Sequence, residues 1–258
     1  MVEAKRIALL IDCDNVSHTA IDGVLAELAK HGMVNIRHAH GDWKSDHLSN
    51  WREKLHPCAI RPMQQMAYTK GKNATDIAMI IDAMDLLYSK SIHAFALMTS
   101  DSDFTPLVLR IHEAGLPVYG FGENKTPKAF IDACFEFIYI ENLTMVDNEK
   151  STVEGQKTTE RKTRAGFPDD LKLVNILRNA VEKTADDDGW SPMSRVGNYI
   201  RNNSSISSVN YGYRSLSELI KASGLFEFDM RHKNTAMYIR SKPYDSAETP
   251  NSLSNKFL

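Results

Sequence analysis

The feature that most constrains the fold is a regular alternation, from residue 5 to 142, of short apolar runs with segments of helical period. This pattern is typical of repeated β–α units built around a mostly parallel sheet. The sequence predicts strands near residues 6–12, 34–39, 60–67, 94–99, 116–121 and 136–140. Between them it predicts helices over residues 19–30, 46–56, 75–89, 104–114 and 127–133.

Two details of these helices can be tested. Gly32 and Gly115 follow the first and fourth helices, where a left-handed glycine commonly ends a helix. The helix over residues 75–89 carries an apolar stripe that we expect to face the core. The stripe consists of Ile77, Ile80, Ile81 and Met84.

A change of composition divides the chain into an α/β domain, residues 1–145, and a smaller C-terminal domain, residues 168–243. Residues 146–167 are polar and charged, which predicts a flexible linker, and residues 244–258 predict a flexible tail. Three amphipathic segments and a pair of short alternating strands follow the linker, in the order of a winged helix of the α+β class. Ser191 and Pro192 are expected to cap its second helix, and Ser215 with Glu218 its third.

Composition limits the possible environments. The 258 residues include 42% hydrophobic ones and carry a formal net charge of −2, so any nucleic-acid surface must be local. The cysteines, Cys13, Cys58 and Cys134, are odd in number and far apart, which favours a reducing cytoplasm over a disulfide framework or a CxxC zinc site. No run of 18 apolar residues occurs, and we expect no membrane association.

Acidic residues follow two of the predicted strands. Asp12, with Asp14 and Asn15 behind it, ends the first strand, and Thr99, Ser100, Asp101 and Asp103 follow the fourth. Asp76 lies in the first turn of a helix that begins at the same edge. Because catalytic groups of parallel sheets gather at the carboxyl ends of the strands, we expect these side chains to lie together.

Clustered carboxylates repel one another unless protons or cations bind among them. Mg²⁺ or Mn²⁺ fits this donor set, because both prefer oxygen ligands and bridge to phosphate. Taken singly, each acid has a structural interpretation: Asp14 as a turn residue, Asp76 as a helix N-terminal charge and Asp103 as a cap. Asp22, Asp82 and Asp85 lie further along helices and are expected on solvated faces.

The remaining candidates carry weaker signals. Lys70 and Lys72 precede Asp76 and can contact phosphate or simply be solvated. Trp43 and Trp51 can stack on bases or pack in the core. The nine histidines, including His38, His40 and His47, show no zinc-ligand spacing and are expected to be structural or exposed.

The N-terminal motifs resemble the NYN domain, a branch of the PIN-like nucleases. They are LLIDCDN, KNATDIAMIIDAMDLL, MTSDSDFTPLVLRIHEAG and VYGFGENKTPKAFIDACFEFIYI. The resemblance implies a PIN-like fold and divalent-metal-dependent hydrolysis of RNA. It also implies metal ligation by Asp12, Asp76, Asp101 and Asp103, with Asn15 and Ser100 in support, and products that carry 5′-phosphate and 3′-hydroxyl ends.

The C-terminal stretches GWSPMSRVGNYIRNN and VNYGYRSLSELIKASGLFEF look like a LOTUS domain, also called OST-HTH. This resemblance implies binding of single-stranded or structured RNA. The cations expected to contact RNA are Arg214, Lys221, Arg231 and Lys233, the last two at the wing. A protein-interaction surface is the alternative.

Two other functions remain open. One is an RNA-binding adaptor that does not cut. The other is a phosphatase of the haloacid-dehalogenase type, with Asp12 and Asp14 as nucleophile and acid, although the order of the later acidic residues argues against it. Dimerisation is common among PIN-like folds, so a homodimer also stays open.

Overall fold

The computed structural model describes residues 5–64, 73–144, 170–231 and 235–242. The predicted linker, 146–167, and the predicted tail, 244–258, lie outside the described residues. The chain forms two compact units. Within the described residues, the first holds 5–144 and 200–219, and the second holds 170–199 and 220–242, each without the gaps named above. The proposed domain boundaries therefore stay a prediction.

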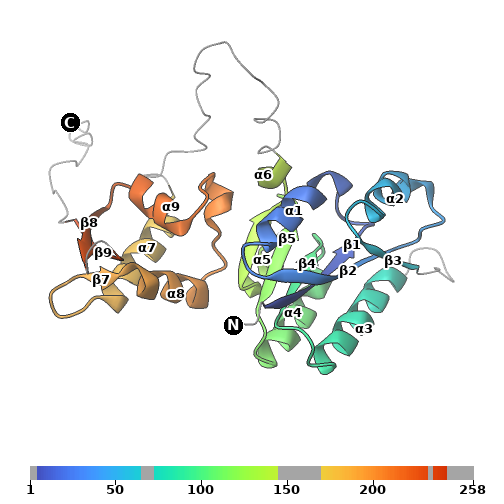
Figure 1. Ribbon diagram of the computed structural model, residues 1–258, viewed down its shortest axis with the longest axis horizontal. Coiled ribbons are helices and arrows are strands. Elements are labelled where there is room, and N and C mark those ends of the chain that lie inside the picture. The colour runs from blue at the N-terminus through green and yellow to red at the C-terminus, as the bar shows by residue number, and fades with distance from the viewer. Residues whose placement is uncertain (1–4, 65–72, 145–169, 232–234, 243–258) are drawn as a thin grey trace, which may run out of the picture. The chain divides into compact units, whose positions relative to one another are not determined.

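A six-stranded sheet forms the centre of the first unit, in the order β3-β2-β1-β4-β5-β6 (Figure 1). The strands are β1 (Arg6–Asp12), β2 (Met33–Gly41), β3 (Arg61–Gln64), β4 (Ala94–Met98), β5 (Val118–Gly122) and β6 (Glu136–Tyr139). Each neighbouring pair is parallel. The strand order reverses between β1 and β4, and ligand sites of open α/β sheets lie at such a point.

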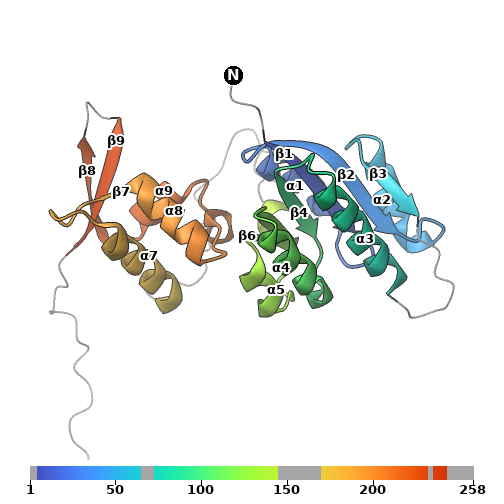
Figure 2. The same cartoon turned by 90° about the horizontal axis from the view of Figure 1, so that it is seen from below.

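Helices cover both faces of this sheet (Figures 1 and 2). On one face lie α1 (Ile21–Leu28) and α2 (Ser49–Leu55), and on the other lie α3 (Ala74–Tyr88), α4 (Thr105–Glu113) and α5 (Lys128–Ala133). Short 3₁₀ turns, η1 (His18–Ala20), η2 (Asp46–Leu48) and η3 (Ser102–Phe104), lead into three of the helices, and α6 (Glu141–Thr144) follows β6. The α/β class predicted from the sequence is confirmed.

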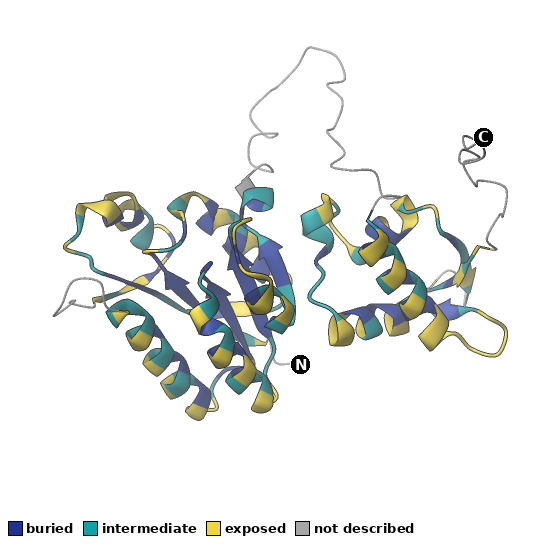
Figure 3. Ribbon diagram, turned by 180° about the vertical axis from the view of Figure 1, so that it is seen from behind, coloured by how far each residue is buried: buried dark blue, intermediate teal, exposed yellow. Residues whose placement is uncertain are grey.

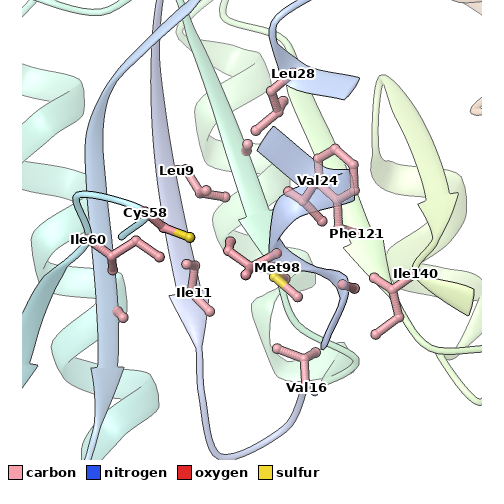
Figure 4. Packing of buried hydrophobic residues seen from close by; sticks show 14 of the residues in the cluster. Leu9, Ile11, Val16, Val24, Leu28, Cys58, Ile60, Met98, Phe121 and Ile140 are labelled. Atoms are coloured by element: carbon pink, nitrogen blue, oxygen red, sulfur yellow. The ribbon is translucent and has the colours of Figure 1, made fainter. Parts of the chain in front are cut away.

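Strand β1 is buried on both faces, so its alternate side chains enter two cores. Ile7, Leu9 and Ile11 pack with α1 and α2, whereas Ala8 and Leu10 pack with α3 and α4. Figure 4 shows the first core, which Leu9 and Ile11 share with Val24 of α1. In Figure 3 the central strands of the sheet are dark blue, because they are buried. Burial of this strand fixes its register, and therefore the place where Asp12 emerges.

Two predictions about the helices are wrong in part. In the predicted stripe of α3, Ile80 and Met84 pack against the core as expected, but Ile77 and Ile81 are 58% and 57% exposed. The buried side chains are Met79, Ala83 and Leu87, because apolar side chains surround most of α3 and the periodicity did not single out one face. Gly115 has a left-handed φ of 81°, as expected, but Gly32 does not. A Cβ at Gly32 would lie 2.4 Å from the carbonyl oxygen of Lys5, so close backbone approach is the reason for this glycine.

The C-terminal elements follow the predicted order. They are α7 (Leu171–Thr184), β7 (Ser191–Pro192), α8 (Met193–Asn203), η6 (Ser208–Tyr211), α9 (Leu216–Ala222), β8 (Phe226–Arg231) and β9 (Ala236–Ser241). The strands form an antiparallel sheet in the order β7-β9-β8. Ser191 is not a helix cap as predicted, because it pairs with Ile239 and its hydroxyl donates to the carbonyl oxygen of Thr184.

Within the described residues, no helix combines the length and the apolar character that a membrane span requires.

Candidate active site

Asp12 lies at the carboxyl end of β1, beside the point where the strand order reverses. Its side chain is fully buried. The Oδ2 atom accepts hydrogen bonds from Asn15 Nδ2 at 2.6 Å and from Thr99 Oγ1 at 2.9 Å. The other oxygen, Oδ1, is buried and has no hydrogen-bond partner among the residues that the structure describes. One carboxylate oxygen is thus fixed in place and the other is left available.

The loop after β4 carries Thr99 to Asp103. Asp101 caps the 3₁₀ turn η3, because its Oδ1 accepts the backbone N–H of Asp103 at 2.8 Å. Ser100 Oγ accepts the N–H of Glu123 at 2.9 Å and so ties this loop to the end of β5. A Cβ at Gly122 would lie 2.6 Å from the carbonyl oxygen of Thr99, which is why glycine is needed here. The loop is therefore held by both neighbouring strand ends.

Asp76 lies in the first turn of α3, and the turn is joined to the β1 loop. Thr75 Oγ1 donates to Asp14 Oδ2 at 3.0 Å, which links two segments 61 residues apart. Asp14 and Asp103 are exposed, whereas Asp76 and Asp101 are partly buried. Three chain segments thus bring their acids to the same edge of the sheet, as the strand-end pattern predicts.

Burial and neighbouring charges shift the pKa values of two acids at the site. Burial raises the pKa of Asp76 to about 6, and the charges of its neighbours contribute further. These neighbours are Asp12, Asp101, Asp103 and Asp14, in order of decreasing effect. Burial also raises the pKa of Asp12, although the hydrogen bonds from Asn15 and Thr99 oppose this shift. Ionisation of all the aspartates at this edge at the same time is therefore unfavourable.

The aspartates fit a divalent cation in charge and in donor type. Asp12 Oδ1 is buried and lacks a hydrogen bond among the described residues. A cation bound to this oxygen would compensate for the missing hydrogen bond. The carboxylates are not tightly gathered, however. Among the described residues, the group whose ligand atoms all lie within 4.8 Å of one another is His38, His40 and Asp82, not the four aspartates. Mutual repulsion explains the wider spacing of the acids.

The predicted phosphate contacts Lys70, Lys72 and Lys233 lie outside the described residues. Of the tryptophans, Trp51 is 3% exposed and its indole N–H donates to the carbonyl oxygen of Val16, so it packs in the core. Trp43 is half-buried and donates to the carbonyl oxygen of Met63. The ring of Trp51 is therefore not available for stacking on a base, and Trp43 packs in part against the same core.

The other predicted RNA contacts differ in how they are held. Arg214 and Lys221 are exposed, with the Lys221 ammonium 6.0 Å from the ring centre of Phe228. Arg231 is engaged within its own unit: it pairs with Asp229 and Asp188 and lies over the ring of Tyr238 at 4.4 Å. Lys221 is therefore a better candidate than Arg231 for a phosphate contact.

Sequence reasoning missed one cluster entirely. Asp82 does not lie on a solvated face as predicted: its side chain is only 14% exposed and accepts hydrogen bonds from His38 and His40. The available signal was the spacing of the two histidines, since residues two apart on a strand point to the same face.

A six-stranded parallel sheet with acids from three segments at its carboxyl edge is the arrangement of PIN-like NYN domains. The chain belongs to the NYN domain family, which its residues 6–141 match, and residues 169–238 match the OST-HTH/LOTUS domain. NYN domains are part of the nuclease superfamily, and the LOTUS domain is an RNA-binding module. Both resemblances seen in the sequence are confirmed.

Two solved structures match part of the chain. A protein of unknown function from Vibrio parahaemolyticus RIMD 2210633 is 18% identical, with a TM-score of 0.46, and the match covers 54% of this chain and 95% of that one. An uncharacterized protein from Nitrosomonas europaea is 28% identical, with a TM-score of 0.30, over 39% and 96% of the two chains. No curated protein matches the chain significantly.

Proposed function

We propose that the protein is a metal-dependent ribonuclease that hydrolyses phosphodiester bonds of RNA at the acidic edge of its NYN domain. The observation that carries this proposal is the meeting of acids from three chain segments at the carboxyl edge of the sheet. The charges of these acids add to burial in raising the pKa of Asp76. A structural role does not account for so many like charges at one point. The family match supports a nuclease rather than a phosphatase.

Each acid has a distinct part in this proposal. Asp12 would hold a cation through Oδ1, while Asn15 and Thr99 fix its orientation through Oδ2. Asp76, Asp101 and Asp103 would supply the remaining protein ligands. Mg²⁺ or Mn²⁺ bound there would lower the pKa of a coordinated water and offset the charge of the phosphate.

The chain's own residues set the rest of the chemistry. Ser100 and Asp101 hold the loop after β4 rigid, so the carboxylates are in place before RNA arrives. Water attacks phosphorus and the O3′ atom leaves, which yields the 5′-phosphate and 3′-hydroxyl ends expected of this class. We propose an endonuclease, because the site lies at an open sheet edge where Asp14 and Asp103 are exposed.

The C-terminal domain would bind RNA through its exposed cations, with Arg214 and Lys221 as the described candidates. We also propose a cytoplasmic location, since all three cysteines are unpaired and buried in the domain that carries the site.

The test is cleavage of labelled single-stranded and structured RNA with Mg²⁺, with Mn²⁺ and with a chelator. The variant Asp101→Asn keeps the capping of η3, because asparagine caps as well as aspartate does. Asp85→Asn, an exposed acid on α3, is the matched control. We expect cleavage by the wild type and the control, and none with chelator or Asp101→Asn. Metal-independent cutting would overturn the mechanism, and binding without cutting would favour an adaptor.

A further inference from the structure

Two histidines of β2 and one aspartate of α3 meet beneath the acidic edge. His38 and His40 are two residues apart on the strand, so both side chains point to the face that α3 covers. Asp82 lies six residues after Asp76 on that helix. The cluster is therefore part of the sheet–helix contact that positions the first turn of α3.

The geometry gathers two imidazole nitrogens around one carboxylate oxygen. Asp82 Oδ2 lies 2.7 Å from His38 Nδ1 and 3.0 Å from His40 Nε2. All the ligand atoms lie within 4.8 Å of one another. Ligands of a tetrahedral zinc ion are about 3.3 Å apart when the metal–ligand distance is near 2 Å. A small rotation of the Asp82 side chain would open the present hydrogen bonds to that separation.

Charge and accessibility also suit a cation. Burial disfavours ionisation of Asp82, but the hydrogen bonds from the two imidazoles hold its pKa well below its usual range, so the carboxylate stays charged. His40 is 1% exposed, whereas the side chains of His38 and Asp82 are 15% and 14% exposed. One side of the cluster is therefore buried, and the other side reaches solvent.

One observation is left unexplained by hydrogen bonding alone. His40 Nδ1 is buried and has no hydrogen-bond partner in the described part of the chain. Asp12 lies opposite His40 in the β1–β2 register, and its Oδ1 is likewise unpartnered. A cation at Nε2 would place the ring proton on Nδ1, and ligating histidines commonly donate this proton to a carboxylate. Asp12, on the adjacent strand, would accept this proton with one lone pair of Oδ1 and keep the other lone pair for the cation at the acidic edge.

We propose that His38, His40 and Asp82 form a second metal site, separate from the acidic edge, for a borderline transition-metal ion of the Zn²⁺ type. Two imidazoles and one carboxylate are the donor set that such ions prefer, whereas the all-oxygen edge suits Mg²⁺ or Mn²⁺. The ion would fasten β2 to α3 and so stabilise the helix that carries Asp76.

The test is titration of the metal-stripped full chain with Co²⁺, followed by visible absorption, in excess Mg²⁺ so that the hard ion competes for the acidic edge. Four-coordinate Co²⁺ bound to nitrogen absorbs far more strongly than hydrated six-coordinate Co²⁺. We expect one strongly absorbing equivalent that Zn²⁺ displaces. His38→Gln and Asp82→Asn should each weaken it by about tenfold or more.

Two controls separate this site from the others. Asp101→Asn alters only the acidic edge and His47→Gln alters an exposed histidine, so both should leave the Co²⁺ spectrum unchanged. Zn²⁺ should also raise the melting temperature of the wild type and not that of His38→Gln. The proposal is overturned if the wild type shows no such absorption, or if His38→Gln folds and binds Co²⁺ as the wild type does. RNA cleavage does not enter either readout.

Discussion

At the scale of single residues, the protonation of Asp76 affects the free energy of unfolding. Its pKa is about 6 in the folded chain, because burial and the neighbouring carboxylates disfavour the charged form, against an ordinary value of 3.8. The folded state therefore holds this proton more tightly than the unfolded state. The resulting stability is fully present below about pH 3.8 and is lost as the pH rises through about 6.

Asp76→Asn should consequently stabilise the metal-free protein at pH 7. The shift corresponds to roughly 3 kcal/mol, and the partial exposure of the group reduces the expected gain to about 1–2 kcal/mol. Urea unfolding in a chelator measures it, and repetition at pH 4 should show a much smaller gain. A variant that is less stable than the wild type at pH 7 would contradict this account of the site.

Thr99 tests whether orientation of Asp12 matters. Thr99→Val removes the hydroxyl that donates to Asp12 Oδ2 and accepts the N–H of Asp101, whereas Thr99→Ser keeps it. We expect about a tenfold or larger loss of kcat for valine, typical of a lost supporting hydrogen bond, and little change for serine. Single-turnover cleavage provides the comparison. Equal rates for valine and serine would show that the hydroxyl is dispensable.

The placement of individual site residues was partly predictable. Asp12 and Asp101 follow buried strands, so their meeting at one edge follows from parallel-sheet geometry. Asp82 was misassigned because its position within α3 gives no sign that two histidines 42 and 44 residues earlier would lie beneath it. Strand spacing reveals a shared face, but it does not reveal which helix covers that face.

At the scale of elements, helix α3 shows the limit of periodicity. Its apolar residues occur on nearly every side, and the structure buries Met79 and Ala83 rather than Ile77 and Ile81. Contacts with the sheet set the rotation of α3 about its axis. Its first turn lies at the acidic edge, where Thr75 donates a hydrogen bond to Asp14. The helix was predictable from its pattern, but its rotation was not.

Truncation of α3 side chains checks that rotation. Met79→Ala should lower the free energy of unfolding by about 2–5 kcal/mol, because it empties a fully buried site. Ile81→Ala should change it by about 0.5 kcal/mol or less, since Ile81 is 57% exposed. Urea unfolding of both variants is sufficient. A larger loss for Ile81→Ala would mean that this exposed face has a partner.

At the scale of the whole molecule, two domains of different chemistry share one chain. The two-domain order was predictable because composition changes sharply after residue 145, and the motifs on each side are specific. It was less predictable which cations of the C-terminal domain form ion pairs within it. Arg231 and Lys221 are both cations of the same module, but only the structure shows that Arg231 is paired with two aspartates.

Lys221 should therefore contribute to RNA binding but not to chemistry. Lys221→Ala is expected to weaken RNA binding and to reduce the slope of log K against log salt by about 1, the signature of one lost phosphate contact. Lys128→Ala, an exposed lysine of α5, is the matched control. Binding measured across salt concentrations checks this, with kcat at saturating RNA unchanged. An unchanged slope would assign RNA binding to other cations.

The central claim is that the aspartates at the sheet edge cut RNA. Its most direct test is the single-turnover rate of RNA cleavage in saturating Mn²⁺ by the wild type and by Asp12→Asn, with both proteins shown to be folded and to bind RNA equally. The account predicts a loss of about a hundredfold or more for the variant, because Asp12 would touch the cation directly. Equal rates for the two proteins would contradict it.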